Sequence, residues 1–429
     1  MIDFEFFDNK NITNITAEEI KNKCDYNSDI PKIIFENNAH FKLCNVLNNL
    51  APYQKVLLLS TKTPYSLYGE NVSNIILNSK NILKELIFDV NLQGEYSNAK
   101  RVIDCVEENT KVIVVLGGGT VIDIAKFVAD KLSIPLVILP TTLSPSSCLD
   151  YVLITDGVSE KRNLYKTTLA KYIIVDTKII NNLKDNFIAA GYGQLVCEVI
   201  ELFNMNYVKI MEQKCSYLFS KIAKECATML PVINKKISAG ADTTNELILE
   251  CLYACAISKC GSNLPLSDDI LTALNLNKTR LLGENMFLSA VFLGKLYKIF
   301  FLQKAFEYNN FLDVIEYLKK GGSQIDFENN QLKGNAQNYF EQLQKLEITI
   351  FKLVEFKMEL KSEAEFLDLV IKKCFKTFKR IYADCGYKVL KSVNEKMLKQ
   401  ALYSVENISN SVTPLIQIKN LGLLQEICG

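Results

Sequence analysis

The stretch VVLGGGTVIDIAK, residues 114–126, joins an apolar run to an apolar helical pattern through three glycines. Such a run is typical of a strand buried on both faces, and the residues after the glycines predict a helix over 121–132. A helix that starts at such a turn offers unpaired N–H groups and the positive end of its dipole, and glycine lets an anion approach the backbone. The four residues expected to bind a pyrophosphate are Gly117, Gly118, Gly119 and Thr120.

Three glycines alone also fit a tight strand-to-helix turn that binds nothing, because the stretch is neither a GxGxxG fingerprint nor a P-loop. The next apolar run, 136–139, is followed by PTTLS, which carries the hydroxyls of Thr141, Thr142 and Ser144. Hydroxyls at the end of a parallel strand are expected where a ligand crosses the edge of a sheet. Asp123 lies one turn into the helix, where it either accepts a hydrogen bond from a ligand or interacts with the helix dipole.

Strand-like and helix-like segments alternate outward from this stretch. The strand-like segments are 32–35, 55–59, 85–88, 111–116 and 136–139, and the helix-like segments are 39–50, 71–78, 99–108 and 121–132. This alternation predicts right-handed β-α-β units, a parallel sheet and an α/β domain over 1–185. Beyond it, apolar residues recur every three and four positions, which predicts an all-α domain over 186–429. The helices expected there are 193–207, 211–229, 244–258, 286–307, 311–319, 339–362, 363–382 and 393–406.

The composition excludes several classes of protein. The 49 Lys and Arg residues are matched by 48 Asp and Glu residues, so the chain lacks the basic field of a nucleic-acid-binding protein. No apolar run reaches the roughly 18 residues of a membrane helix, and the first residues do not resemble a signal peptide. The 13 cysteines include no CxxC pair, so we expect reduced thiols in a cytoplasmic protein. The single histidine, His40, excludes a site that needs two histidines of one chain.

GGGTVIDIAK (117–126), followed by IPLVILPTTLS (134–144), resembles the dehydroquinate-synthase-like superfamily, which includes the iron-containing alcohol dehydrogenases. The greatest similarity is to the sn-glycerol-1-phosphate dehydrogenases, and it runs from about residue 31 to residue 283. Three further stretches carry it: YQKVLLLSTKT (53–63), YIIVDTKIINNLKDNFIAAGYGQLV (172–196) and GSNLPLSDDI (261–270).

This resemblance implies a Rossmann-like N-terminal domain, a helical C-terminal domain and a cleft between them. It also implies an oxidoreductase that moves a hydride between NAD or NADP and a small polyol phosphate or ketone. Asp123 would lie near the nicotinamide as the candidate catalytic residue, and Thr141, Thr142 and Ser144 would contact the cofactor. Thr61 stands where relatives often carry an acid that selects against a 2′-phosphate, so the choice between NAD and NADP stays open.

The resemblance breaks at the metal site. Active relatives bind one divalent metal through an aspartate and two histidines, and here those positions hold Gln194, Leu271 and Leu282. A neutral amide and two leucines cannot form such a site, so we expect a degenerate metal site with no divalent metal. An oxygen-rich Mg²⁺ or Mn²⁺ site stays open as an alternative, although two of its acids also fit a helix N-terminus. Its candidate ligands are Asp268, Asp269, Glu284 and Cys260.

Other polar side chains have ordinary interpretations. We expect Lys126 to be a cation on a helix face, and His40 to be a surface or helix-end residue. In the loop after PTTLS, relatives carry a substrate-binding aspartate near the position of Ser146 or Ser147. Three further cations either bind a substrate phosphate or are simply solvated: Arg162, Lys166 and Lys171.

The dehydrogenase hypothesis rests on the retained cofactor motif. Without a metal, another group must stabilise the alkoxide, and a loss of several kcal/mol slows the reaction by several orders of magnitude. The alternative is a catalytically impaired, nucleotide-binding pseudoenzyme, and a minor alternative is a sugar phosphate cyclase of the dehydroquinate-synthase type. In each case we expect a small-molecule partner, with no nucleic acid and no membrane, and a homo-oligomer is left open.

Overall fold

The computed structural model describes residues 31–149, 152–155, 162–212, 217–241, 244–259, 281–304, 351–353, 355–381 and 414. The chain forms two compact units. The first joins Met1–Leu195 to Thr228–Asn263, and the second joins Val196–Ala227 to Leu264–Gly429. Two long helices, α10 (Asp185–Glu212) and α11 (Tyr217–Ala239), therefore contribute residues to both units.

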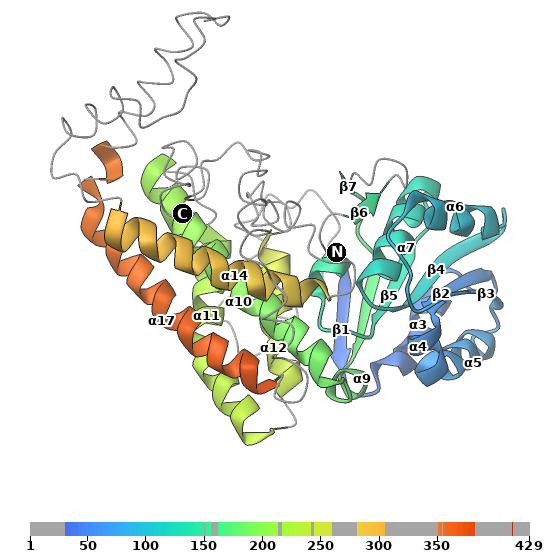
Figure 1. The fold of residues 1–429 in the computed structure, drawn as a ribbon. Coiled ribbons are helices and arrows are strands. Elements are labelled where there is room, and N and C mark those ends of the chain that lie inside the picture. Colours follow the sequence, from blue (N-terminus) through green and yellow to red (C-terminus); the bar gives the residue numbers. More distant parts are fainter. Residues whose placement is uncertain are drawn as a thin grey trace, which may run out of the picture. The chain divides into compact units, whose positions relative to one another are not determined.

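A six-stranded parallel sheet forms the centre of the first unit (Figure 1). The order across the sheet is β1-β8-β5-β4-β2-β3. The four inner strands are almost completely buried, which explains why they read as continuous apolar runs. The strands are β1 (Lys32–Glu36), β2 (Lys55–Thr61), β3 (Ile82–Phe88), β4 (Thr110–Gly117), β5 (Leu136–Pro140) and β8 (Tyr172–Asp176).

Helices cover both faces of this sheet (Figure 1). On one face, α3 (Leu43–Leu50) and α5 (Glu70–Asn78) share a hydrophobic cluster with alternate residues of β2, β4 and β5. On the other face, α7 (Gly119–Leu132) packs on β4, on β5 and on α6 (Tyr96–Cys105). The remaining elements of this unit are η1 (Ala39–Lys42), α4 (Lys62–Pro64), η2 (Tyr65–Gly69), α8 (Pro145–Leu149), α9 (Thr177–Asn181), α12 (Thr244–Lys259) and a hairpin of β6 (Val152–Thr155) with β7 (Arg162–Tyr165).

The order of the strands creates a topological switch point between β2 and β4. From β2 the chain continues to β3 on one side, whereas from β4 it continues to β5 on the other. Ser60, fully buried near the end of β2, donates a hydrogen bond of 2.7 Å to the carbonyl oxygen of Leu116 and so ties the two carboxyl ends together. Open α/β sheets bind their ligands outside the carboxyl ends of the strands at such a point, and the glycine turn follows β4 there directly.

The strands and helices expected from the sequence in the first 185 residues are all present. Helix α7 begins at Gly119, two residues before the expected start, and α6 spans Tyr96–Cys105 instead of 99–108. Strand β8 and the β6–β7 hairpin were not predicted. The segment that forms β8 was identified only as part of a stretch that carries the family resemblance, yet this strand pairs with both β5 and β1 and completes the sheet.

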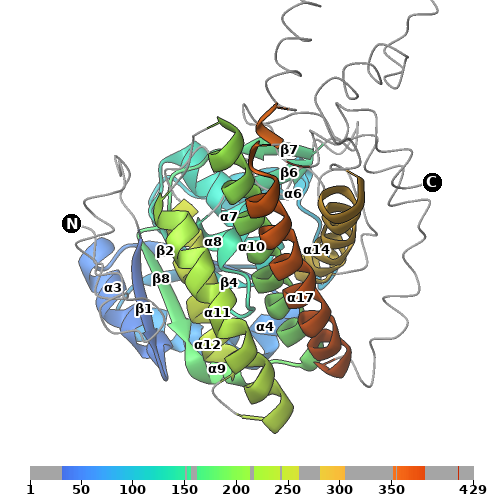
Figure 2. The ribbon, with the colours of Figure 1, turned by 90° about the vertical axis from the view of Figure 1, so that its left-hand side faces the viewer.

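The described part of the second unit is helical, as the sequence predicts. Helices α14 (Leu282–Ile299) and α17 (Lys357–Ile381) pack side by side (Figure 2), and the rings of Phe287 and Phe378 stack with centroids 3.7 Å apart. A π-helical turn, η3 (Phe300–Lys304), follows α14. Helix α17 is continuous across residues 362 and 363, where the sequence predicted a break between two helices, because its buried stripe keeps one spacing throughout. The expected helices 311–319 and 393–406 lie outside the described residues.

One helix among the described residues, Leu282–Leu302, is long and apolar enough to cross a membrane by length and composition. However, 61% of its apolar window is buried inside the protein. A core helix meets the same criteria, and the packing of α14 on α17 fits that interpretation.

Candidate functional site

The glycine turn lies at the carboxyl end of β4, as the sequence predicts. Gly117 ends the strand, Gly118 is extended (φ −102°, ψ −168°) and Gly119 opens α7. The first helical hydrogen bond runs from the N–H of Ile122 to the carbonyl of Gly118 over 3.2 Å. The earlier N–H groups of the helix, including that of Thr120, therefore have no acceptor within the helix. Together with the helix dipole, they give this partly exposed turn the capacity to bind an anion.

The segment after β5 packs directly on the two partly exposed glycines. A Cβ atom at Gly118 would lie 3.0 Å from Cγ2 of Thr142, and a Cβ atom at Gly119 would lie 2.9 Å from Oγ of Ser147. Both contacts are tight, so the neighbouring side chain would have to move if either glycine carried a Cβ atom. Contacts within the protein therefore favour glycine at both positions in addition to any ligand, which fits the tight strand-to-helix turn that the sequence left open.

Two threonines of this loop provide polar groups at the turn. The N–H of Thr141 donates to the carbonyl of Gly117 over 2.9 Å, which aligns the ends of β4 and β5. The Oγ1 atom of Thr142 is buried and has no hydrogen-bond partner among the described residues. A buried hydroxyl without a partner costs stability. Because this one lies beside Gly118, it retains hydrogen-bonding capacity that a bound phosphate or ribose could satisfy.

Helix α10 holds the other end of the same loop. Gln194 is 2% exposed, and its Nε2 atom donates to Oγ of Ser144 over 3.1 Å. Three residues earlier, a Cβ atom at Gly191 would lie 2.4 Å from Cβ of Leu143, so the helix backbone contacts the loop closely. The amide that occupies the expected aspartate position thus binds the loop after β5.

A buried polar cluster lies behind the glycine turn. Lys126 is fully buried, and its Nζ atom donates to the carbonyl of Ser147 over 3.2 Å, so the expectation of a cation on the helix face was wrong. Burial raises the pKa of the Cys148 thiol to about 12, while its contact with Tyr253 and the charge of Lys126 lower it and the charge of Asp123 raises it. Burial likewise raises the pKa of Tyr253, whose hydroxyl lies 3.9 Å from Cys148 Sγ.

The sequence indicates which stripe of α7 Lys126 occupies, although not that this stripe is buried. Gly119, Asp123 and Lys126 are spaced by four and then three residues, so they share one stripe of α7. Gly119 and Lys126 both contact Ser147 of α8, so this stripe faces α8, and the two helices pack together. The stem of a lysine can follow such a stripe and place its ammonium group on a carbonyl.

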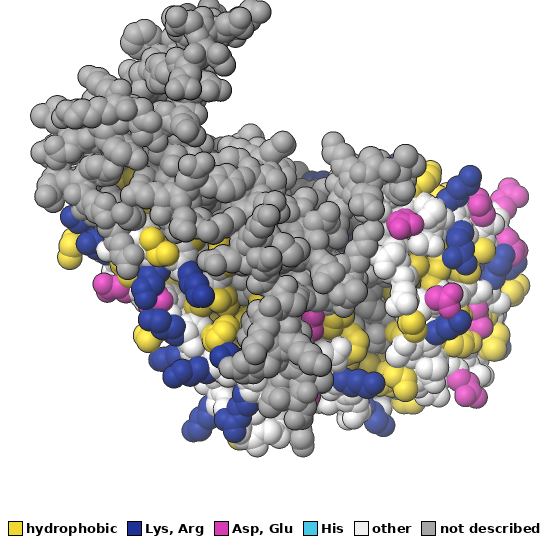
Figure 3. Space-filling model, in the orientation of Figure 1, with side chains coloured by type: hydrophobic (Ala, Val, Ile, Leu, Met, Phe, Trp, Pro, Cys, Tyr) yellow, Lys and Arg dark blue, Asp and Glu magenta, His cyan; other side chains and the backbone are white. Residues whose placement is uncertain are grey.

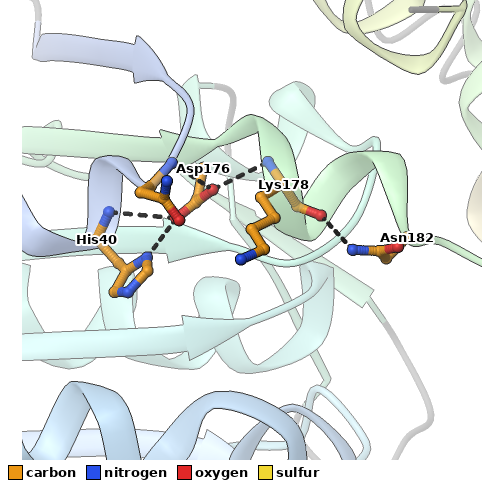
Figure 4. A network of polar contacts seen from close by, with 5 residues as sticks. His40, Asp176, Lys178 and Asn182 are labelled. Atoms are coloured by element: carbon orange, nitrogen blue, oxygen red, sulfur yellow. Dashed lines mark hydrogen bonds and ion pairs between the residues drawn. The ribbon is translucent and has the colours of Figure 1, made fainter. Parts of the chain in front are cut away.

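The single histidine belongs to a structural network at the ends of β1 and β8 (Figure 4). The Nδ1 atom of His40 contacts the carboxylate of Asp176, which is 2% exposed. The same carboxylate accepts the N–H groups of Asn38 at 3.1 Å and Lys178 at 2.9 Å. His40 lies in η1 with its side chain 15% exposed, so it is a helix-end residue, as expected, but mostly buried.

At the carboxyl end of β2, the polar groups are exposed. Thr61 is the last residue of the strand and is partly exposed. The next residue, Lys62, is 67% exposed and forms an ion pair of 2.5 Å with Asp89, which follows β3 and is 79% exposed. The hydrogen bond from Lys62 is the main cause that lowers the pKa of the Asp89 carboxyl.

Among the residues that the structure describes, those at the expected metal positions do not fit a divalent metal. Gln194 offers a neutral amide that already binds Ser144, and Leu282, the first residue of α14, offers no donor. His40 is engaged by Asp176. Of the alternative ligands, Glu284 is buried and its carboxylate accepts the N–H of Leu281 over 3.2 Å, which caps α14. The other positions considered, Leu271, Asp268, Asp269 and Cys260, lie outside the described residues.

Three cations were also considered as contacts for a substrate phosphate. Lys166 and Lys171 are exposed, and Arg162 lies in β7. Acidic and basic side chains are interspersed over the visible face of the first unit (Figure 3). The structure therefore gives no support for a substrate phosphate at Lys166 or Lys171.

Comparison with known proteins identifies relatives of this sheet domain. Residues 34–182 match the model of the iron-containing alcohol dehydrogenase family. A glycerol dehydrogenase of Thermotoga maritima is 36% identical over 152 residues, which cover 32% of this chain and 42% of the relative. A glycerol-1-phosphate dehydrogenase [NAD(P)+] of Methanocorpusculum labreanum is 26% identical over 249 residues, which cover 55% of this chain and 65% of the relative. The matched part is thus less than two thirds of either curated relative.

Solved structures show the same fold over nearly the whole chain. A probable glycerol dehydrogenase from Sinorhizobium meliloti aligns with a TM-score of 0.60 at 14% identity and covers 93% of this chain and 97% of its own. The NADH-dependent butanol dehydrogenase A of Thermotoga maritima aligns with a TM-score of 0.59 at 14% identity over 93% of this chain and 97% of its own. These alignments establish the fold: a parallel-sheet domain and a helical domain.

Proposed function

Because residues 34–182 match the iron-containing alcohol dehydrogenase family, we propose that the chain binds NAD or NADP across the β4–α7 turn as an oxidoreductase. Its reaction would move a hydride between the nicotinamide and a small polyol phosphate or ketone, since the relatives include a glycerol-1-phosphate dehydrogenase [NAD(P)+]. The observation that carries this proposal is the glycine turn at the β2–β4 switch point, with the PTTLS loop packed on it.

Each part of the turn has a defined task in this proposal. The N–H groups at the start of α7 bind the pyrophosphate, because they point out of the helix and carry its positive end. The hydroxyl of Thr142 donates to the cofactor beside Gly118, which satisfies an atom that is otherwise buried without a partner. The hydroxyl of Ser147, next to Gly119, lies where a phosphate oxygen or a substrate could accept from it.

Asp123 is the candidate catalytic residue. It lies on the stripe of α7 that faces α8, one turn after the glycines, and is partly exposed. The cofactor supplies the hydride at its nicotinamide ring, so the protein has to orient that ring and the substrate and to manage one proton. A carboxylate at this position can hold the carboxamide or the substrate hydroxyl in line for transfer.

No step of the proposed reaction runs through a metal ion. The donor set at the superfamily position does not fit one, because Gln194 donates its amide to Ser144 and Leu282 has no donor atom. Protein groups must then stabilise the alkoxide. A dehydrogenase of this kind is expected to be slower than metal-containing relatives by several orders of magnitude.

A nucleotide-binding protein without turnover is the second candidate function. The observation that favours it is that Gln194, at the position of the metal-binding aspartate, makes a structural contact with Ser144, and that the single histidine is engaged elsewhere, by Asp176. In either case we propose a cytoplasmic protein with a small-molecule ligand and with no nucleic-acid or membrane partner. The cysteines that the structure describes are all free thiols, which fits that compartment.

Titration of the purified full chain with NADH and with NADPH, followed by nicotinamide fluorescence, tests the cofactor site. Metal analysis of the same preparation, and an assay of NAD(P)H oxidation with dihydroxyacetone phosphate and with dihydroxyacetone, tests the reaction. We expect saturable binding without stoichiometric metal. Binding with slow turnover that is lost in Asp123→Asn supports the dehydrogenase, and binding without turnover supports the second candidate. If neither nucleotide binds, both proposals are wrong.

A further inference from the structure

The end of β2 is the place where a bound dinucleotide would expose its adenosine ribose. β2 is the neighbour of β4 on the side away from β5, across the switch point from the PTTLS loop. In open dinucleotide-binding sheets, an acid after the neighbouring strand binds the ribose 2′-hydroxyl of NAD, whereas a cation there accommodates the 2′-phosphate of NADP. The residues at this position therefore decide which of the two cofactors fits.

The sequence after the apolar part of β2 provides hydroxyls and a cation but no acid. Ser60 is already bound to the carbonyl of Leu116, so Thr61 is the first available hydroxyl. Thr61 is extended (φ −106°, ψ 159°) and partly exposed, and the exposed Lys62 follows it directly. A 2′-phosphate at this strand end would meet no carboxylate on β2 itself.

A second cation approaches the same corner from α6. The guanidinium of Arg101 lies 5.0 Å from the ring centroid of Phe88, the last residue of β3. Its charge also contributes to lowering the pKa of the Asp89 carboxyl, after the larger effects of Lys62. The charges of both cations thus act on one carboxylate at the ends of β2 and β3.

The ion pair between Lys62 and Asp89 does not block this corner. Both side chains are exposed, at 67% and 79%, and exposed pairs contribute little to stability because water and salt screen them. A phosphate monoester carries a charge of about −1.5 to −2 at pH 7 and has three strong acceptor oxygens. It therefore competes well with Asp89 for the ammonium group of Lys62.

We propose that Lys62 and Arg101 bind the 2′-phosphate of NADP, and that the chain prefers NADP to NAD. This inference rests on the cofactor site proposed above. The ammonium of Lys62 exchanges Asp89 for the phosphate, the guanidinium of Arg101 binds a second phosphate oxygen, and Thr61 donates its hydroxyl. Charge-assisted hydrogen bonds of this kind account for a preference of about tenfold or more, which corresponds to about 1.4 kcal/mol.

Calorimetric titration of the full chain with NADPH and with NADH at low salt measures the preference directly. NADPH should bind at least about tenfold more tightly, and the ratio should shrink in high salt, because exposed charges are screened. Lys62→Gln and Arg101→Gln should each weaken NADPH binding several-fold and leave NADH binding unchanged. Thr61→Asp should reverse the preference.

The matched control is Lys42→Gln. Lys42 is a half-exposed lysine of the same unit, paired with Glu36 at 3.4 Å, and it lies beside the opposite edge strand. Its removal should change neither affinity. Equal affinities, or tighter binding of NADH, overturn the NADP preference and leave the cofactor site standing. Binding of neither nucleotide overturns the cofactor site itself, and the preference with it.

Discussion

The two sides of the glycine turn are built in opposite ways. On the β5 side, the PTTLS loop is mostly buried: Thr142 packs against Gly118, and Gln194 donates a hydrogen bond to Ser144. Ser147 of the following helix, α8, packs against Gly119. On the β2 side, Lys62 and Asp89 are exposed and held only by an ion pair. Close packing fixes geometry, whereas exposed charge adjusts affinity. In the proposed cofactor site, the pyrophosphate part would therefore be preorganised, and the ribose part would select between NAD and NADP.

We call the β5 side of the turn, with the PTTLS loop and α8, the packed side. Gly119→Val is expected to perturb it most. A Cβ atom at this position would lie 2.9 Å from Ser147 Oγ, and valine adds two methyl groups beyond it, so the side chain of Ser147 must move and α8 is pushed away from the turn. We expect loss of detectable nucleotide binding and a decrease of about 1–3 kcal/mol in the free energy of unfolding, as is usual for overpacking. Fluorescence titration and urea denaturation measure the two effects.

Gly240→Ala is the control for that variant. A Cβ atom at Gly240 meets nothing within 4 Å, but its φ of +66° strains any other residue. The control should lose stability and keep its nucleotide affinity. If both variants bind normally, the loop is not held by the glycine turn in the way described.

Lys126→Met tests the support behind the packed side. The carbonyl of Ser147 loses a charged donor, so we expect the free energy of unfolding to fall by about 1–3 kcal/mol in urea denaturation. Lys131→Met, in the exposed last turn of the same helix, should have no comparable effect. Equal stability of the two variants would show that the buried ammonium group is dispensable.

The Cys148 thiol, which lies on the packed side, makes the free energy of unfolding depend on pH. Its pKa is raised from 9.0 to about 12 by burial, so the unfolded chain loses this proton first as the pH rises. The stability that it contributes is present below about pH 9 and is lost between about pH 9 and 12. At about pH 10 the loss approaches about 1.4 kcal/mol.

Urea denaturation at about pH 8 and about pH 10 compares the wild type with Cys148→Ala. The variant should lose less stability on alkalisation, whereas Cys44→Ala, at a partly exposed thiol, should behave like the wild type. If the free energy of unfolding of Cys148→Ala falls as much between about pH 8 and about pH 10 as that of the wild type, the raised pKa of Cys148 is wrong.

Thr142→Val removes the buried hydroxyl that has no partner among the described residues while it keeps the shape of the side chain. We expect stability to stay equal or to rise by up to about 1 kcal/mol, because an unsatisfied polar atom is removed. Nucleotide affinity should fall several-fold, because the donor to the ligand is lost. A fall in stability with unchanged affinity would mean that the hydroxyl serves the protein alone.

Asp89→Asn should have the smallest effect, because it lies on the exposed side. We expect no measurable change in thermal stability and a several-fold gain in NADPH affinity, since Lys62 no longer has a competing carboxylate. Glu36→Gln, at the other exposed pair, is the control and should change neither property. A clear loss of stability in Asp89→Asn would mean that the ion pair between Lys62 and Asp89 stabilises the fold, as the contacts of the packed side do.

The sequence predicted the sheet, the position of the glycine turn and the loop that follows β5, because apolar runs and glycines report directly on local structure. It did not reveal that Thr142 and Ser147 pack against the glycines, since this contact depends on how the segments that follow β4 and β5 meet. It also missed β8, because the five residues of this strand are recognised as a strand only from their pairing with β5 and β1.

Lys126 and Gln194 show a second limit of prediction from sequence. Both are polar residues on helices, and each finds its partner on the loop between β5 and β6, at Ser147 and at Ser144. Helical spacing indicated the stripe that Lys126 occupies, but only the packing of α8 on that stripe explains its burial. Burial of a charged group depends on such a specific acceptor, which no local pattern encodes.

The pairing of β1 with β8 constrains how this chain can fold during its synthesis. Lys32 pairs with Tyr172, and the carboxylate of Asp176 binds the backbone beside His40. Strand β1, the first of the strands that the structure describes, is therefore synthesised some 140 residues before the strand that it pairs with. Until then its edge is open and prone to wrong partners, while β2, β3 and β4 can already pair with one another. The single histidine thus lies in the contact that closes the sheet last.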